Sequence, residues 1–202
     1  MTMTLYGLKP RFQAMLRPLV GKLASAGITA NQVTIAAAFG SVLLGALLAI
    51  ANNPALFLLL PLWLFLRMAL NAADGMLARE FSQKSDLGAY LNELGDLLSD
   101  AALYLPFALI APFTPMSVVI FVVLALVAEV AGILGPMIGA SRRYDGPMGK
   151  SDRALVCGAL GLWVGLAVLP AWAAWIMPLL SLVLLVCIFN RIRAGLAERR
   201  GC

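Results

Sequence analysis

The stretch NAADGMLAREFSQKSDLGAYLNELGD, residues 71–96, joins two apolar runs and carries many polar side chains for such a place. Asn71 and Asp74 lie about one helical turn apart near the end of the first run, so they share one face of a helix. Asn92 and Asp96 have the same relation near the start of the second run. Two antiparallel helices joined by this short loop would bring Asp74 and Asp96 together.

The residues on both sides of this stretch predict a membrane protein. The chain has 202 residues, of which 62% are hydrophobic and 12% charged, whereas a soluble domain is about half apolar and a quarter charged. The sequence therefore predicts an all-α integral membrane bundle of six transmembrane helices over 31–195, in a single domain covering 1–202. The apolar runs long enough to span a bilayer are 32–51, 55–78, 87–111, 116–141, 154–170 and 172–190.

Charged residues collect on one side of the predicted bundle. The turns at 52–54, 112–115 and 169–171 contain no Asp, Glu, Lys or Arg, while the alternate connections and both ends of the chain are basic. The positive-inside rule then predicts that both termini are cytoplasmic, in the inner membrane of a bacterium. Residues 196–202 are expected to form a basic cytoplasmic tail.

The first thirty residues, 1–30, mix basic and apolar side chains. We interpret them as an amphipathic interfacial helix lying on the membrane surface, and a disordered basic tail is the alternative. Pro10 and Pro18 are expected to limit any helix here to short pieces.

The composition excludes several kinds of catalysis. The chain has no histidine, which removes Ser-His-Asp and Cys-His catalysis and histidine metal ligands. Its cysteines, Cys157, Cys187 and Cys202, have no partner at metal-ligand spacing and are interpreted as small apolar residues. Acid–base chemistry must therefore fall to carboxylates, lysine or tyrosine.

The clustered acids and amides have two interpretations from spacing alone. Carboxylate and amide oxygens are hard ligands suited to Mg²⁺ or Mn²⁺, so a metal site near Asp74 and Asp96 is one interpretation. Buried ion pairs that brace the bundle are the other.

The order of residues resembles the signature of the CDP-alcohol phosphotransferase (CDP-alcohol phosphatidyltransferase) family, D-x2-D-G-x2-A-R-x8-G-x3-D-x3-D. The spacing matches throughout 71–96, and the matching residues are Asp74, Gly75, Ala78, Arg79, Gly88 and Asp96. The six-helix layout, the N-terminal segment and the Asn-Gln-Val-Thr sequence at 31–34 are also similar to that family.

The resemblance implies a metal-dependent transferase of phospholipid synthesis that joins a CDP-linked lipid to a small alcohol and releases CMP. It implies Mg²⁺ or Mn²⁺, one or two ions, held by Asn71, Asp74, Asn92 and Asp96, with Asp96 also the general base. Asp74, Gly75, Ala78, Arg79 and Gly88 would bind the nucleotide. The expected partners are the two substrates and the bilayer, with a homodimer and no nucleic acid.

The first and third acids of the signature are asparagines here, Asn71 and Asn92. An asparagine carbonyl can bind Mg²⁺ but brings no charge, so metal binding should be weaker, more dependent on substrate or limited to one ion. Glu93 lies on another face of its helix, and Asp100 lies one turn deeper than Asp96.

A basic connection between the fourth and fifth runs supplies candidate phosphate- or acceptor-binding residues. These are Arg142, Arg143, Lys150 and Arg153. The positive-inside rule alone would also place basic residues there, so the sequence leaves both explanations open.

Three further charges lie deep in the predicted helices. Arg67, Asp100 and Glu129 are each about 18–20 Å from the charged end of their helix, at about 1.5 Å per residue. Because an unpaired charge at that depth costs several kcal/mol, Arg67 is predicted to pair with Asp100, Glu129 or both. This structural ion cluster would brace the floor of the site.

Two other functions compete with the transferase. One is a catalytically weak or inactive relative that binds a nucleotide-lipid or a membrane partner, which the two asparagines favour. The other is a small transporter with Asp74, Asp96 and Asp100 along an ion path, which is disfavoured because it gives no reason for the glycines of the signature.

Overall fold

The computed structural model describes residues 9–51 and 53–201, and within these ranges the chain is helical and has no strand. The α-helices are α1 (Lys9–Ser25), α2 (Ala30–Ile50), α3 (Leu59–Glu80), α4 (Asp86–Tyr104), α5 (Pro115–Ile133), α6 (Lys150–Leu166) and α7 (Ile176–Gly201). Short 3-10 helices are η2 (Pro54–Leu58), η3 (Leu105–Leu109), η4 (Gly135–Ile138) and η5 (Ala171–Trp175).

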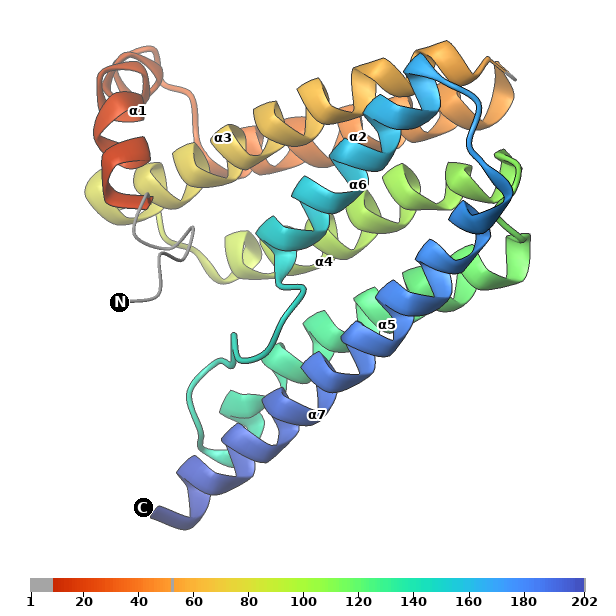
Figure 1. The fold of residues 1–202 in the computed structure, drawn as a ribbon. Helices are drawn as coiled ribbons and strands as arrows, with labels where there is room; N and C mark the ends of the chain where they lie inside the picture. Colours follow the sequence, from red (N-terminus) through yellow and green to blue (C-terminus); the bar gives the residue numbers. More distant parts are fainter. Residues whose placement is uncertain (1–8, 52, 202) are drawn as a thin grey trace.

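The helices α2 to α7 run in alternating directions (Figure 1). The first residues of α2, α4 and α6 and the last residues of α3, α5 and α7 therefore lie toward the same side, which we call the site end. Helix α1 lies beside this end and packs on α3. The main neighbours within the bundle are α2 with α4, α5 with α7, α2 with α3, and α3 with α6.

Several helices begin at a residue that caps them. Thr29 and Gln32 form a capping box before α2, in which each side chain accepts a hydrogen bond from the other residue's backbone N–H. Ser85 caps α4 and Thr114 caps α5, each through a backbone N–H three residues on. These caps set where the chain enters the bundle, at the site end for α2 and α4.

Four helical segments are long and apolar enough to cross a membrane. The protein is therefore a multi-pass membrane protein. Helix α4 carries acids along its length and α6 has only 17 residues with a charged start, so the count of six spans stays a prediction. The four segments are Ala30–Ile50, Pro54–Glu80, Pro115–Ile133 and Ala171–Arg200.

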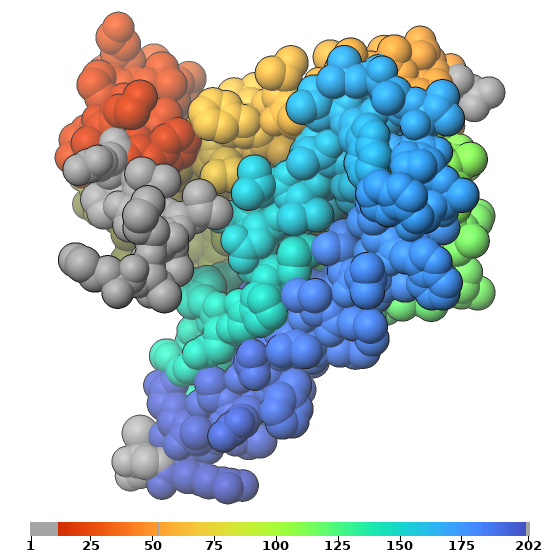
Figure 2. All heavy atoms as spheres, viewed as in Figure 1, coloured from red at the N-terminus to blue at the C-terminus, as the bar shows by residue number. Residues whose placement is uncertain are grey.

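The outer surface is apolar, as lipid requires. Leu62 is 70% exposed and Val168 is 95% exposed, and in water such a surface would be unfavourable. Figure 2 shows one face of the molecule, built from α1, α3, α6 and α7. The interior is a large cluster that includes Phe57, Phe107, Phe121, Leu103 and Leu184.

Glycines let some helices come into backbone contact. A Cβ atom at Gly45 of α2 would lie 2.2 Å from the carbonyl oxygen of Ala102 on α4, so any larger residue would push these helices apart. Gly161 and Gly165 lie where η2 joins α3, and a Cβ at Gly165 would lie 2.5 Å from Leu58 Cγ of η2. This pair therefore serves packing inside the bundle.

One terminal expectation differs from the structure. Helix α1 is one helix of 17 residues that runs through Pro18, so the expectation of short pieces is wrong. An ion pair of 3.0 Å between Arg17 and Glu80 and the buried side chain of Val20 hold α1 on α3. At the other end α7 continues as helix to Gly201, through most of the expected tail. The interfacial position of α1 stays a prediction, and residues 1–8 lie outside the described part.

Candidate active site

Asp74 and Asp96 are both buried at the site end, on α3 and α4. Asp74 is 6% exposed and Asp96 is 8% exposed. The Oδ2 atom of Asp74 accepts a hydrogen bond of 2.8 Å from the hydroxyl of Thr34 on α2. The charge of Asp74 interacts with the charges of Asp96 and Lys150. The loop between α3 and α4 therefore brings the two acids to the same part of the site end.

Both carboxylate oxygens of Asp96 are engaged by donors from other helices. Its Oδ1 atom accepts hydrogen bonds of 3.1 Å from Asn71 Nδ2 and of 3.1 Å from Arg67 Nη2. Its Oδ2 atom accepts a hydrogen bond from the ammonium of Lys150, the first residue of α6. Asp96 of α4 is thus linked to α3 and to α6 by hydrogen bonds and ion pairs.

The glycines and small residues of the signature lie along the same helix ends. The guanidinium of Arg79 lies over Gly75, where an added Cβ would be 3.2 Å from Arg79 Nη2. A Cβ at Gly88 would be 2.7 Å from the side-chain oxygen of Asn31 on α2. Ala78 packs against a small apolar cluster of α1, α2 and α3. Gly75 is partly exposed with the Arg79 side chain in this position.

An ion cluster lies directly beneath Asp96. Arg67 Nη1 is 2.6 Å from Asp100 Oδ1, and Arg153 Nη2 is 2.9 Å from Asp100 Oδ2. Arg153 also reaches Glu129 Oε2 at 3.1 Å, and Arg191 lies 3.6 Å from the same oxygen. The predicted contact of Arg67 with Asp100 is present, and Glu129 joins the cluster through Arg153.

The position of Arg153 corrects one expectation from the sequence. It was grouped with Arg142, Arg143 and Lys150 as a phosphate- or acceptor-binding residue. The structure buries it to 1% exposure, where it donates to Asp100, to Glu129 and to the backbone oxygen of Met148 at 3.2 Å. Because its guanidinium is already bonded to these acceptors, Arg153 holds the start of α6 in place and does not face an incoming phosphate.

The two arginines of the loop before α6 are also paired. Arg142 contacts Glu93 and lies 3.2 Å from Glu129. Burial opposes the charge of Arg142, but Glu93, Tyr144 and Glu129 together outweigh it and raise the pKa of Arg142 above its ordinary value. Its guanidinium stacks on the exposed ring of Tyr144 at 5.2 Å. Arg142 therefore stays charged at the mouth of the site.

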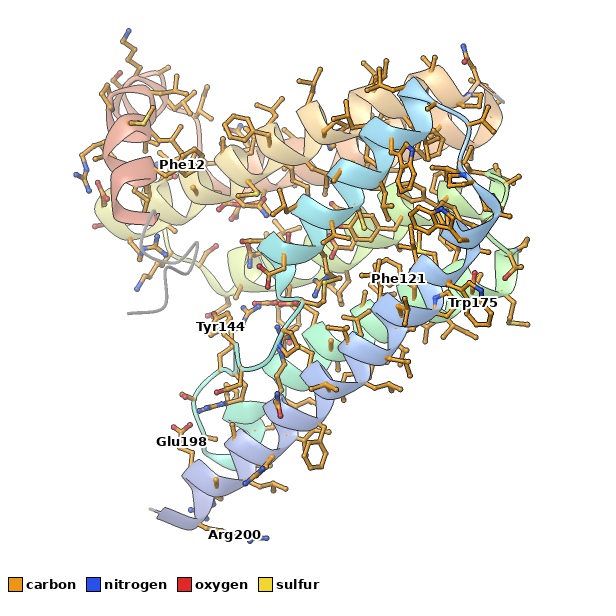
Figure 3. The ribbon with its side chains drawn as sticks, viewed as in Figure 1. Phe12, Phe121, Tyr144, Trp175, Glu198 and Arg200 are labelled. Carbon is orange, nitrogen blue, oxygen red and sulfur yellow. The ribbon has the colours of Figure 1, made fainter. Side chains whose placement is uncertain are left out.

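Arg143 faces away from this network, toward the end of α7. It donates to Asp145 at 2.8 Å and to Glu198, and its hydrogen bonds to Asp145 raise the pKa of Arg143. Figure 3 places Tyr144 and Glu198 toward the site end and Trp175 toward the opposite end.

Two partners were missed by reasoning from the sequence. Thr34 stands in the Asn-Gln-Val-Thr sequence at 31–34, but no role was assigned to its hydroxyl. Arg191 on α7 was taken as part of the basic end of the chain, whereas it is 2% exposed and lies against Glu129. The available signal for Arg191 was its place as the first charge after the long apolar part of α7.

The residues fit one divalent ion better than two. The described residues contain no group of three or more acids, histidines or cysteines that could hold a metal, and Asp96 is already neutralised by Lys150 and Arg67. Asp74 keeps one oxygen outside its bond to Thr34. Since Mg²⁺ is commonly held by one or two carboxylates together with substrate phosphates and water, this donor set suits a single ion that arrives with a diphosphate.

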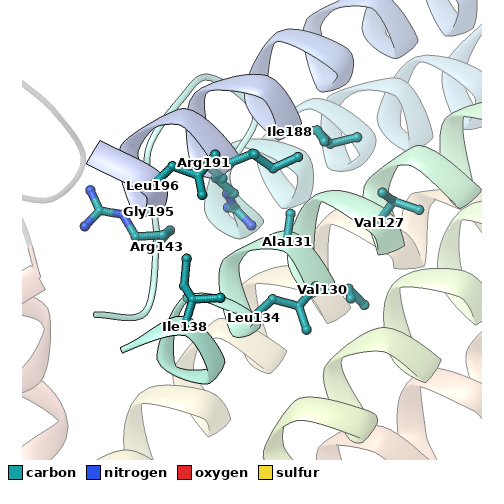
Figure 4. Close-up of a pocket in the computed structure, with 12 residues that line it drawn as sticks. Val127, Val130, Ala131, Leu134, Ile138, Arg143, Ile188, Arg191, Gly195 and Leu196 are labelled. Carbon is teal, nitrogen blue, oxygen red and sulfur yellow. The ribbon is translucent and has the colours of Figure 1, made fainter. Parts of the chain in front are cut away.

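A separate apolar pocket lies between α5 and α7 toward the site end (Figure 4). Its volume is about 310 Å³. Val127, Val130, Leu134 and Ile188 line it, with Arg143 and Arg191 among its polar members. It lies apart from Asp74 and Asp96, so the acids and this pocket are distinct features.

The fold and site together define a class: a helical membrane protein whose buried acids and cations gather at one end of the bundle. The sequence model of the CDP-alcohol phosphatidyltransferase family matches residues 27–187. The chain belongs to this family.

Two kinds of relative are similar to the chain. The inner membrane protein YnbA of Escherichia coli (strain K12) is 48% identical over 197 residues, covering 96% of this chain and 97% of that protein. The phosphatidylinositol phosphate synthase PgsA1 of Mycobacterium tuberculosis with CDP-DAG bound has a TM-score of 0.72 and 20% identity, covering 88% of this chain and 92% of its own. The same enzyme with manganese and citrate also has a TM-score of 0.72 and 20% identity, covering 90% and 88%. At this identity the PgsA1 structures show that the fold is shared.

Proposed function

We propose that the protein is a CDP-alcohol phosphotransferase of phospholipid synthesis, which transfers a phosphatidyl or similar phospho group from a CDP-linked lipid to a small alcohol and releases CMP. The observation that carries this proposal is the meeting of Asp74, Asp96 and Lys150 at one end of a bundle of this family. CDP-diacylglycerol is the donor we favour, because PgsA1, which shares the fold, has been solved with CDP-DAG bound.

The last turns of α3 and the start of α4 would bind the nucleotide. Gly75, Ala78 and Gly88 present little side chain there, so a flat base and ribose can approach the helices. Arg79 lies over Gly75 in the structure and would swing onto a phosphate when the nucleotide enters. Asp74 would face the diphosphate.

The reaction is displacement at the phosphorus that carries the lipid. The hydroxyl oxygen of the acceptor forms a new bond to this phosphorus, and the bond from the phosphorus to the bridging oxygen of CMP breaks. Asp96 takes the hydroxyl proton, and CMP leaves as a phosphate monoester. Positioning and charge neutralisation supply most of the acceleration in phosphoryl transfer, and Lys150 and Arg142 are the cations that we assign to the diphosphate and acceptor. Arg143, which pairs with Asp145 and Glu198, is left out of this role.

A divalent ion, Mg²⁺ or Mn²⁺, is part of the proposal. Asp74 and the amide oxygens of Asn71 and Asn92 would hold it. When bound, the ion would stabilise the negative charge of the diphosphate. Asp96 stays the base.

We further propose that all six helices α2 to α7 span the membrane with the site end in the cytoplasm, where both termini would lie. The alternating directions of these helices and the charges gathered at the site end support this orientation. α1 would lie along the membrane surface. A homodimer rests on the family resemblance alone.

The test is CMP release by the purified protein in detergent, with CDP-diacylglycerol, a panel of small alcohols and either Mg²⁺ or Mn²⁺. Asp96→Asn should lower the rate by at least about 100-fold, because general-base catalysis is commonly worth 10²–10⁴. Asp86→Asn, an exposed acid on the same helix, is the matched control and should keep full activity. Full activity in Asp96→Asn would refute the assignment of the base.

A second candidate function is a catalytically weak or inactive relative that binds a nucleotide-lipid or a membrane partner. The observation in its favour is that Asn71 and Asn92 replace two acids while Asp96 is already paired on both oxygens. Binding of CDP-diacylglycerol without CMP release from any alcohol would favour this function over the transferase.

A further inference from the structure

The charge around Asp96 is complete without a metal. Its Oδ2 atom contacts the Lys150 ammonium, and its Oδ1 atom contacts Arg67 at 3.1 Å. Arg67 is shared with Asp100 at 2.6 Å. Asp74 is the other acid at this level. A second divalent ion beside Asp96 would have to displace the lysine and would find too few carboxylates in the described residues.

Lys150 is delivered to Asp96 by a rigid support. It is the first residue of α6, whose first turn is closed by a hydrogen bond of 3.0 Å from the Gly149 N–H to Asp152 Oδ2. Arg153, one turn further, anchors the helix to Asp100. The positive end of the α6 dipole adds to the ammonium charge at this place. A positive charge next to Asp96 is therefore a built feature of the fold.

Asn71 fits the same arrangement. Its Nδ2 group donates to Asp96 Oδ1 at 3.1 Å. An aspartate at this position would put a second carboxylate against Asp96, and two carboxylates this close need a cation or a shared proton. With an amide at 71 and a lysine at 150, Asp96 is satisfied by neutral and cationic donors alone.

We propose that the ammonium of Lys150 is a built-in cation that takes the place of one of the two metal ions, so that the site works with a single divalent ion. This rests on the proposed transferase function. The two charges of Asp74 and Asp96 are then opposed by one lysine and one ion, which leaves a net positive charge for the diphosphate.

The arrangement also controls when Asp96 can act as a base. Its Oδ2 atom can accept a proton only after Lys150 moves off it. An arriving diphosphate offers Lys150 stronger acceptors, and the flexible side chain can reach them while α6 stays fixed. The proton of the acceptor hydroxyl goes to the freed Oδ2 atom. Donor binding and activation of the base are thereby coupled.

The decisive experiment counts bound Mn²⁺ in the full-length protein with CDP-diacylglycerol, by the loss of the free-ion electron paramagnetic resonance signal. The wild type should bind one ion, and so should Lys84→Gln, which removes an exposed lysine from the loop before α4. The triple variant Asn71→Asp, Asn92→Asp, Lys150→Gln should bind two. Two ions or none in the wild type, or one ion in a folded triple variant, would overturn the proposal.

Lys150→Gln alone decides the matter if the triple variant does not fold. A hydrogen bond from a charged group is worth about 1.5–3 kcal/mol. With one Mn²⁺ present, the affinity of Lys150→Gln for CDP-diacylglycerol should therefore fall at least about tenfold. Lys84→Gln should be unchanged, and an unchanged affinity in Lys150→Gln would refute the role of Lys150. CMP release, measured in parallel, separates the outcomes: one bound ion without turnover would refute the transferase function and leave the ion count standing.

Discussion

Arg67→Met would remove the guanidinium beneath Asp96, and the structure sets the size of the effect. Arg67 contacts Asp100 at 2.6 Å and Asp96 at 3.1 Å, and its own side chain is 4% exposed. Removing one partner of a buried ion pair costs about 3–5 kcal/mol. Asp100 keeps Arg153 at 2.9 Å, and Asp96 keeps Lys150. We therefore expect the low end of the range, about 3 kcal/mol.

A second replacement, Asp100→Asn, tests whether this loss comes from charge. In the double variant a positive and a negative charge leave together, while Arg153 keeps Glu129 at 3.1 Å. The double variant should be less destabilised than the sum of the two single variants by about 1–2 kcal/mol, within the range measured for residues in contact.

The assay is reversible unfolding in mixed detergent micelles by titration with sodium dodecyl sulfate, followed by tryptophan fluorescence. Arg193→Met, which removes an exposed arginine from α7, is the control and should change the free energy of unfolding by less than about 0.5 kcal/mol. A loss below about 1 kcal/mol for Arg67→Met, or additive effects of Arg67→Met and Asp100→Asn, would refute the reasoning.

Three further predictions concern orientation, packing and metal. In intact cells, Lys84→Cys should resist a membrane-impermeant thiol reagent and Thr114→Cys should react, because the site end is proposed to be cytoplasmic; the opposite pattern would reverse the proposed orientation. Gly45→Val should destabilise the bundle by more than about 1–3 kcal/mol, the usual range for overpacking, because a Cβ would lie 2.2 Å from Ala102 O; unfolding at the wild-type detergent concentration would contradict this close contact. Chelation with EDTA should abolish CMP release and leave the unfolding transition in place, because ion pairs hold the site together; turnover that persists in EDTA would exclude a metal-dependent reaction.

Much of the fold follows from patterns that operate over short distances. Apolar runs and the residues between them predict the helices, and the structure adds that Thr29, Ser85 and Thr114 cap α2, α4 and α5. The depth of Arg67 and Asp100, counted along their helices, was enough to predict that they meet. Such features depend on the 1.5 Å rise of a helix and on the cost of an unpaired charge.

Other features depend on how the helices rotate against one another, which spacing does not reveal. Arg142, Arg143, Lys150 and Arg153 look alike in a basic loop, yet one binds Asp96, one is buried on Asp100 and the others pair with nearby acids. The continuity of α1 through Pro18 was also missed. A proline inside a helix removes one hydrogen bond and its ring crowds the preceding turn, and the packing of α1 on α3 compensates for that cost.

The acids of α4 are neutralised by residues of both α3 and α6, and this affects how the protein is assembled in the membrane. A helix that carries Asp96 and Asp100 is expensive to release into lipid by itself. Arg67 of α3 is made before α4, but Arg153 of α6 follows Asp100 by 53 residues. If α4 spans the membrane as proposed, it lacks its full set of counter-charges when it leaves the ribosome, and its stable insertion is expected to wait until α6 is synthesised and docks.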